Sequence, residues 1–194
     1  MALVPELEKI RQEVEAINTQ VAALCEGLSE EDLAWRVEPR QWSIAEVLAH
    51  LQLTNHALLP SVDQAIEHAR RRKLYSNGPF RLNMIGRLSL WLIEPPPRYK
   101  FPAPKPLRPL LKGPARDALP QFLESQQWVM QRVEASSGLD LARARVVPPV
   151  YSFVRTNLLA LFTLFTCHER CHLWQASNVR QHLSPRLETQ EVIS

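Results

Sequence analysis

Apolar residues recur at steps of three and four along separate segments of this chain, and that spacing limits the possible fold more than any other feature. Residues at this spacing lie along one side of a helix, while polar residues fill the other sides. The first segment shows the pattern best, with Leu7, Ile10, Val14, Ile17, Val21, Leu24 and Leu28. A helix with one apolar stripe must pack against other helices. We therefore predict an all-α protein.

Three further segments have the same periodicity, which predicts a four-helix bundle in a single domain, residues 1–194. The second helix begins at Ser43, because Ser43 and Glu46 fit a capping box, and Pro60 is expected to kink or divide it. The chain from Ser29 to Pro39 is expected to be an exit loop. The expected helices cover residues 7–28, 43–74, 115–135 and 153–182.

A proline-rich excursion, residues 76–113, separates the second helix from the third. It contains eight of the sixteen prolines in the chain, so we expect an extended, partly polyproline-like path. The strongly apolar residues 84–93 inside it predict a short helix or strand packed on the bundle, or alternatively a membrane-surface or subunit contact. Because long loops often cover binding sites, substrate selection is a reasonable role for the excursion.

Charge and cysteine content exclude several classes of function. The formal net charge is +3, which is too small for a nucleic-acid-binding surface, so no nucleic-acid partner is expected. No apolar stretch approaches the ~20 residues that span a bilayer, so no membrane partner is expected. Three cysteines and no secretory segment indicate a reducing, cytoplasmic setting.

Two histidines occupy consecutive inward positions of the fourth helix. His168 and His172 are four residues apart, so both imidazoles can face the same point, which is the arrangement of a divalent-metal chelate. His50 lies at the edge of the buried stripe of the second helix and is the candidate third ligand. A hydrogen-bonded core histidine is the competing interpretation, and spacing alone leaves the two open. Cys167 and Cys171 face a direction rotated by ~100° and are expected to be packing residues.

Two side chains near the histidines are candidates for supporting roles. Gln175 lies one short turn beyond His172 and could orient a ligand or a bound water, or form a hydrogen bond at the edge of the core. Glu46 precedes His50 by one turn and could accept an imidazole N–H, although its role as the capping partner of Ser43 is the stronger interpretation. Tryptophans that could wall a pocket, or simply pack, are Trp42, Trp91 and Trp174.

Two motifs together resemble the DinB-like superfamily, in particular the bundles related to the YfiT metal-dependent hydrolases. The first is Trp42-Ser43-Ile44-Ala45-Glu46-Val47-Leu48-Ala49-His50-Leu51, which follows a segment from Leu28 to Arg36 that also matches. The second is His168-Glu169-Arg170-Cys171-His172-Leu173-Trp174-Gln175. The resemblance covers most of the chain and implies an up-down-down-up bundle, a homodimer, and a zinc or nickel ion held by His50, His168 and His172.

The expected function follows from this resemblance and from the histidine set. Three neutral imidazoles would leave a divalent ion its full charge and open positions. The first hypothesis is a metal-dependent enzyme with hydrolase-type chemistry on a small molecule. The second is transfer involving a low-molecular-weight thiol, because characterised relatives include bacillithiol transferases and mycothiol-dependent maleylpyruvate isomerases. The third is a metal-binding bundle without catalysis.

Overall fold

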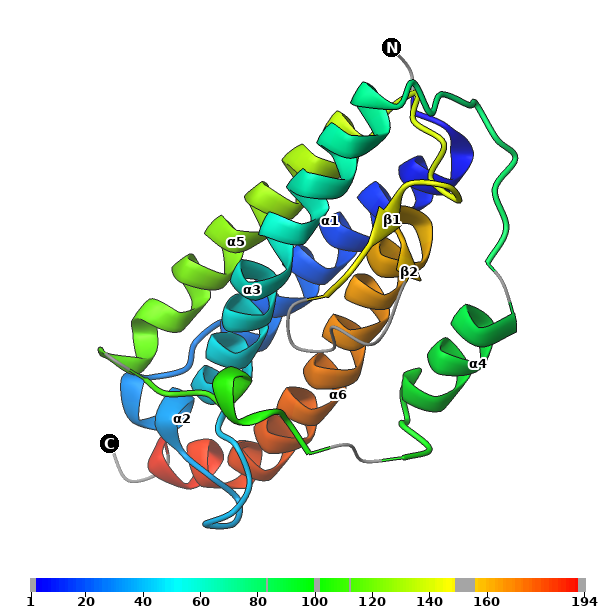
Figure 1. The fold of residues 1–194 in the computed structure, drawn as a ribbon. Coiled ribbons are helices and arrows are strands. Elements are labelled where there is room, and N and C mark those ends of the chain that lie inside the picture. The colour runs from blue at the N-terminus through cyan, green and yellow to red at the C-terminus, as the bar shows by residue number, and fades with distance from the viewer. Residues whose placement is uncertain (1–2, 83, 100–101, 112, 149–155, 192–194) are drawn as a thin grey trace.

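The computed structural model describes residues 3–82, 84–99, 102–111, 113–148 and 156–191 (Figure 1). Four long helices form a bundle, which confirms the predicted all-α fold. Helices α1 and α3 each pack against both α5 and α6, so the helices follow one another around the bundle in the order α1, α5, α3, α6. The four helices are α1 (Pro5–Cys25), α3 (Ile44–Arg71), α5 (Ala118–Ala135) and α6 (Leu158–Glu191).

The directions of the helices explain why the chain needs a long excursion. The C-terminal ends of α3 and α5 lie together, where Arg70 donates to the carbonyl of Ala135 at 2.8 Å. The C-terminal end of α1 lies beside α6, where Arg180 donates to the carbonyl of Glu26 at 3.0 Å. Helices α3 and α5 therefore run parallel to each other, as do α1 and α6 (Figure 1). The chain between α3 and α5 must return along the whole bundle.

That return contains short helices joined by irregular chain. Helix α4 (Met84–Ile93) forms from the apolar segment and packs against α6, so of the alternatives for residues 84–93 the helix on the bundle is confirmed. Two 3₁₀ turns follow, η1 (Lys105–Leu107) and η2 (Ala115–Asp117), and the second leads directly into α5. Beyond α4, Glu94 accepts three hydrogen bonds from the guanidinium of Arg170 on α6, one at 3.0 Å and two at 2.9 Å.

The sequence prediction missed one short helix. Residues expected to form an exit loop contain α2 (Glu30–Ala34). Its start is a capping box: the Asp32 amide donates to the Ser29 hydroxyl at 3.2 Å, and the Ser29 amide donates to the Asp32 carboxylate at 3.0 Å. The Ser-x-x-Asp spacing was a readable signal for this helix.

The limits of the fourth helix also differ from the prediction. Helix α6 begins at Leu158 rather than near residue 153, because the chain just before it pairs with another segment. The pairing joins β1 (Arg145–Val146) to β2 (Thr156–Asn157) in an antiparallel ladder. The Asn157 side chain then accepts the amide of Ala160 at 2.9 Å. The helix continues past His182 to Glu191, and residues 153–155 lie outside the described residues.

Helix α3 begins where the sequence predicts and is not divided at Pro60. The Glu46 amide donates to the Ser43 hydroxyl at 3.2 Å, and the Ser43 amide donates to the Glu46 carboxylate at 2.9 Å, which completes the predicted capping box. Pro60 cannot donate to the carbonyl one turn earlier, on His56. Both residues are exposed, so water can satisfy that carbonyl and the helix continues.

A polar layer divides the core of the bundle into two apolar clusters. One cluster contains Val14, Val129 and Phe162, and the other contains Ile17, Leu48 and Phe122. Between them the buried positions are polar on three helices: Thr54 and Asn55 on α3, Ser125 and Gln126 on α5, and Thr166 and Glu169 on α6. The histidine cluster lies in this part of the bundle. No helix in the described part of the chain is long and apolar enough to cross a membrane.

Candidate metal centre

Three histidines from two neighbouring helices meet at the α3–α6 contact. The ring centroid of His172 lies 4.5 Å from that of His50 and 4.5 Å from that of His168, and the rings of His50 and His168 are 5.4 Å apart. One nitrogen from each ring lies within 4.8 Å of the other two. The structure therefore brings together the three residues that the sequence singled out, in a group that could bind a metal ion.

A backbone carbonyl of the excursion orients His50. The Nδ1 atom of His50 lies 2.6 Å from the carbonyl oxygen of Leu107, in η1. Because a carbonyl only accepts, Nδ1 carries the proton and the lone pair is left on Nε2. The excursion thus reaches the centre through its backbone, which no side-chain pattern could have predicted.

An amide side chain orients His172 in the same way. The Nδ1 atom of His172 lies 3.0 Å from Oε1 of Gln175, so the ring donates there and its lone pair is on Nε2. That Nε2 lies 3.1 Å from Nε2 of His168. Two imidazole nitrogens at this separation are in the range expected for ligands of one ion at ~2.0–2.1 Å from each. Gln175 therefore lies where an orienting residue is needed.

Glu46, the other supporting candidate, does not contact the cluster. Its carboxylate accepts the amide of Ser43 and pairs with Arg36, whose Nε atom lies 2.8 Å from it. Both interactions hold the start of α3 rather than an imidazole. The capping role, which was the stronger interpretation of Glu46, is the one that the structure shows.

Burial keeps all three imidazoles neutral. Burial lowers the pKa of His50, and the hydrogen bond to the Leu107 carbonyl raises it by a smaller amount. Burial also lowers the pKa of His168 well below its usual value, and the neighbouring His172 and His50 lower it further. The pKa of His172 falls to about 3, again mainly through burial and then through His50, against the bond to Gln175. The lone pairs are therefore free near neutral pH.

The centre is walled on one side and open on another. The indole of Trp42 stacks near His172, with ring centroids 5.8 Å apart, and lies 4.9 Å from His50. His50 is buried, whereas His168 and His172 are surrounded by protein on most sides but retain some exposed surface. This partial exposure marks the side from which a small molecule would have to reach the centre. Of the other tryptophans considered, Trp91 pairs with Arg98 on the excursion instead.

A buried carboxyl group next to His168 organises the polar layer. Glu169 accepts hydrogen bonds from the side-chain amides of Asn55 at 3.2 Å and Gln126 at 3.0 Å, and Asn55 also donates to Ser125 at 3.1 Å. Burial raises the pKa of Glu169 to about 7, although both amide donors lower it. These residues fix how α6 faces α3 and α5. The periodicity of apolar residues does not reveal this layer, although the polar residues within the buried stripes were a signal.

The cysteines do not join the cluster. The Cys167 thiol donates to the Glu94 carboxylate at 3.0 Å. Burial and that carboxylate raise the pKa of Cys167 to about 12, and burial raises the pKa of Cys171 as well. Both are therefore protonated thiols near neutral pH, which makes them poor ligands and poor nucleophiles. Both are buried, as expected for packing residues.

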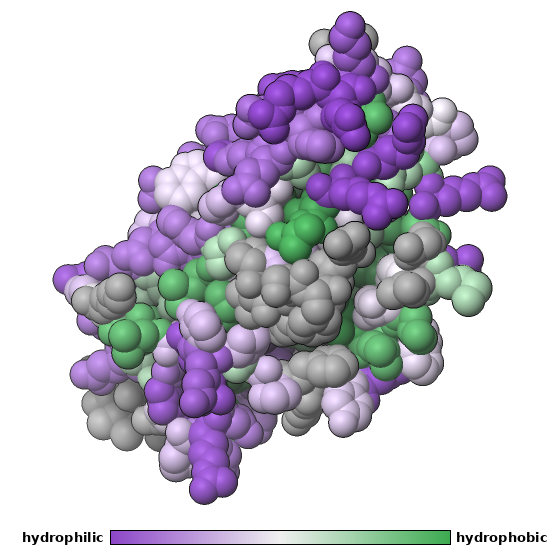
Figure 2. Space-filling view, in the orientation of Figure 1, coloured by the Kyte–Doolittle hydropathy of each residue, from purple (hydrophilic) through white to green (hydrophobic). Residues whose placement is uncertain are grey.

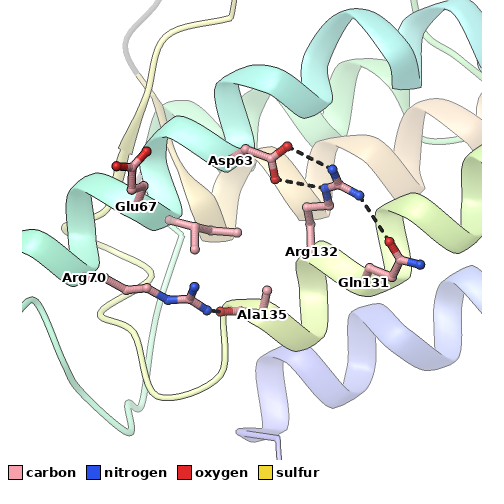
Figure 3. Close-up of a pocket in the computed structure, with 7 residues that line it drawn as sticks. Asp63, Glu67, Arg70, Gln131, Arg132 and Ala135 are labelled. Atoms are coloured by element: carbon pink, nitrogen blue, oxygen red, sulfur yellow. Dashed lines mark hydrogen bonds and ion pairs between the residues drawn. The ribbon is translucent and has the colours of Figure 1, made fainter.

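A surface groove between α3 and α5 does not offer a competing site (Figure 3). Its charged side chains are already paired, with Arg132 donating twice to the Asp63 carboxylate at 2.9 Å. Arg70 closes the far end by its bond to the carbonyl of Ala135. The groove also lies towards the C-terminal end of α3, whereas His50 is near the N-terminal end of that helix.

Comparison with known proteins agrees with the predicted fold and family. The model of the DinB superfamily matches residues 13–176, which include all three histidines and both sequence motifs. No curated protein matches the chain.

Proposed function

The chain belongs to the DinB superfamily, and from that premise we propose that it is a metal-dependent enzyme with a divalent ion held by His50, His168 and His172. The proposal is supported above all by the convergence of three neutral imidazoles. In two of them the Nδ1 proton already has an acceptor: His50 donates to the Leu107 carbonyl and His172 donates to the Gln175 side chain. The Nε2 lone pairs of His50 and His172 are therefore available to one ion.

The donor set fits such an ion. Imidazole nitrogens suit zinc and nickel, and three neutral ligands leave the charge of the ion uncompensated. A backbone carbonyl such as that of Leu107 is a common partner of metal-binding histidines, and the Gln175 amide oxygen accepts from His172 in the same way. When bound, the ion would supply Lewis acidity, lowering the pKa of a water or thiol that contacts it and polarising a substrate carbonyl.

We propose hydrolase-type chemistry on a small molecule as the function. The residues of the chain hold the ligand geometry, and Trp42 excludes water from one side of the cluster. We expect substrate and water to reach the cluster through the exposed surface that His168 and His172 retain. Hydrolysis requires only water as the second reactant, so this proposal demands the least of the site.

One observation favours thiol transfer as a second candidate. Within the described part of the chain, no carboxylate joins the histidine cluster, because Glu46 and Glu169 are committed elsewhere. A hydrolase commonly uses such a group to take a proton from water. A thiol loses its proton more easily, and a centre with uncompensated positive charge would stabilise the thiolate.

Elemental analysis of the purified protein tests the metal. We expect about one divalent ion per chain in the wild type, and a loss of at least about tenfold in His50→Ala and in His168→Ala. His182→Ala is the matched control, because His182 lies on α6 but is exposed and bonds its own helix. Wild-type protein that neither carries nor takes up stoichiometric metal would refute the proposal.

A substrate panel then separates the three functions. Cleavage of esters or amides by the metal-loaded protein without a thiol, lost in His168→Ala, supports hydrolysis. Activity that requires an added low-molecular-weight thiol supports transfer. Bound metal with no turnover under either condition supports the non-catalytic bundle and contradicts both enzyme proposals.

A further inference from the structure

The excursion is far more basic than the rest of the protein. Residues 76–113 contain seven lysines and arginines and one acidic residue, whereas the remaining chain contains 16 basic and 19 acidic residues. The excursion is thus at +6 and the remainder at −3. Five of these cations are described, and all are exposed without an ion pair to any described residue: Arg81, Arg87, Arg98, Lys105 and Arg108.

Helix α4, in the middle of this basic segment, exposes large apolar side chains. Met84 is 84% exposed, Leu88 58% and Trp91 55%, so these residues are not covered by the described protein. Their spacing of four and then three residues places them on one side of the helix. Figure 2 shows hydrophobic residues on the right of the view, where Figure 1 places α4, in contrast to the hydrophilic C-terminal end of α3.

The end of α4 is fixed to the bundle, so the exposed side is held facing outward. Glu94 pairs with Arg170 of α6 at 2.9 Å and accepts the Cys167 thiol at 3.0 Å. At the same end, the guanidinium of Arg98 lies over the ring of Trp91, 4.5 Å from its centroid, and donates to the Trp91 carbonyl at 2.7 Å. A tryptophan and an arginine are thereby presented together at the surface.

We propose that α4 and the cations around it form a docking element for an anionic phospholipid surface. The helix is about 15 Å long, half the ~30 Å needed to cross the hydrocarbon, so it would lie in the interface. Apolar side chains enter the boundary between headgroups and chains, tryptophan prefers that depth, and flanking cations reach the phosphates. Basic residues on or beside an amphipathic helix attract it to such surfaces. The proposal goes beyond the proposed function and revises our expectation of no membrane partner.

The positive charge of the excursion favours an anionic lipid surface, rather than a second copy of the chain, as the partner of α4. A two-fold contact through α4 would place the same patch on both copies, so the basic segments would face each other and repel. An acidic lipid surface attracts the cations on and beside α4, namely Arg81, Arg87 and Arg98. The same surface also accepts the apolar side chains of Met84, Leu88 and Trp91. A homodimer, which the family resemblance implies, would then use another face.

Co-sedimentation of the purified protein with vesicles tests this proposal. We expect binding to vesicles with about 30% phosphatidylserine in phosphatidylcholine, weakened by salt, and little binding to phosphatidylcholine alone. Arg81→Ser with Arg87→Ser should lower the partition coefficient about 30-fold, about fivefold for each cation removed. Leu88→Glu should reduce binding further by removing apolar insertion and adding repulsion.

The control variant removes two positive charges from a part of the surface away from α4. Arg71→Ser with Arg72→Ser neutralises two exposed cations at the C-terminal end of α3 and should change binding by less than about threefold. Unchanged helical content in every variant shows that the fold is intact. An equal loss in the control would overturn the proposal, as would absence of vesicle binding by the wild type. A change from dimer to monomer in Leu88→Glu, measured by sedimentation, would assign the face to a protein contact instead.

Discussion

Asn55→Leu should destabilise the protein strongly, because Asn55 connects two helices to the carboxyl group at the centre of the polar layer. The residue is 1% exposed, and its amide donates to Glu169 at 3.2 Å and to Ser125 at 3.1 Å. Leucine has a similar size but no donor. One oxygen of the Glu169 carboxylate then loses its partner in a site that water does not reach.

The expected loss of unfolding free energy is about 3 kcal/mol. A buried hydrogen bond to a charged group contributes roughly 1.5–3 kcal/mol, and the neutral bond to Ser125 adds about 1 kcal/mol. The apolar leucine side chain offsets part of this sum through its burial.

Urea unfolding followed by circular dichroism measures this loss. The protein should be treated with chelator, since bound metal would add its own stabilisation. The unfolding should be measured at pH 8, because the pKa of Glu169 is raised to about 7 and the carboxylate is ionised above that pH. Gln64→Leu is the matched control, because it replaces an amide by leucine at an exposed position of α3 and should shift stability by less than about 0.5 kcal/mol.

A double-mutant cycle identifies the partner. In a Glu169→Gln background the group left unpaired is a neutral amide, so Asn55→Leu should cost about 1–2 kcal/mol less than in the wild type. If Asn55→Leu unfolds at the same urea concentration as Gln64→Leu, or costs the same with and without the Glu169 carboxylate, the reasoning about the polar layer is wrong.

Three further outcomes are expected. Burial raises the pKa of Cys25 to about 11, so iodoacetamide should alkylate this thiol about 100-fold more slowly than a free cysteine at pH 7.5. The alkylation rate should rise about tenfold per pH unit until the thiol ionises. Peptide mass spectrometry measures the rate, and rapid labelling of the folded protein would contradict the expectation. Ser43→Ala removes the capping box of α3 and should cost about 1 kcal/mol in urea unfolding, and no loss would show that the cap is unimportant. Arg170→Met removes the cation that holds both Glu94 and Glu13, so trypsin should cut the excursion several-fold faster, whereas an unchanged rate would show that this clamp does not hold α4.

Features that depend on local spacing could be predicted from the sequence. The stripe of Leu7, Ile10 and Val14 depends only on residues within one helix, and so does the Ser43 capping box. The three histidines could be singled out because two of them are one turn apart and the third belongs to a recognisable motif. For the same reason α2 was predictable, and the Ser29–Asp32 signal was present in the loop that we expected there.

Features that depend on the axial register between helices could not be predicted from local spacing. The partners of Glu169 are Asn55 and Gln126, more than forty residues away along the chain, and their contact requires the axial register of α3, α5 and α6. The early start expected for α6 failed for a similar reason. The chain at Thr156 pairs with Val146, and a two-residue ladder leaves almost no periodic signal.

The Leu107 carbonyl shows how topology and site chemistry are linked in this protein. Parallel α3 and α5 force the chain to return from one end of the bundle to the other before α5 can begin. The returning chain passes the α3–α6 contact, where the histidines lie, and there it supplies the acceptor that fixes the tautomer of His50. An antiparallel bundle with short loops would bury the same histidines without this acceptor, and the imidazole could place its proton on either nitrogen. The excursion is therefore part of the centre, and a change that displaces η1 should weaken metal binding even though it removes none of the three ligands.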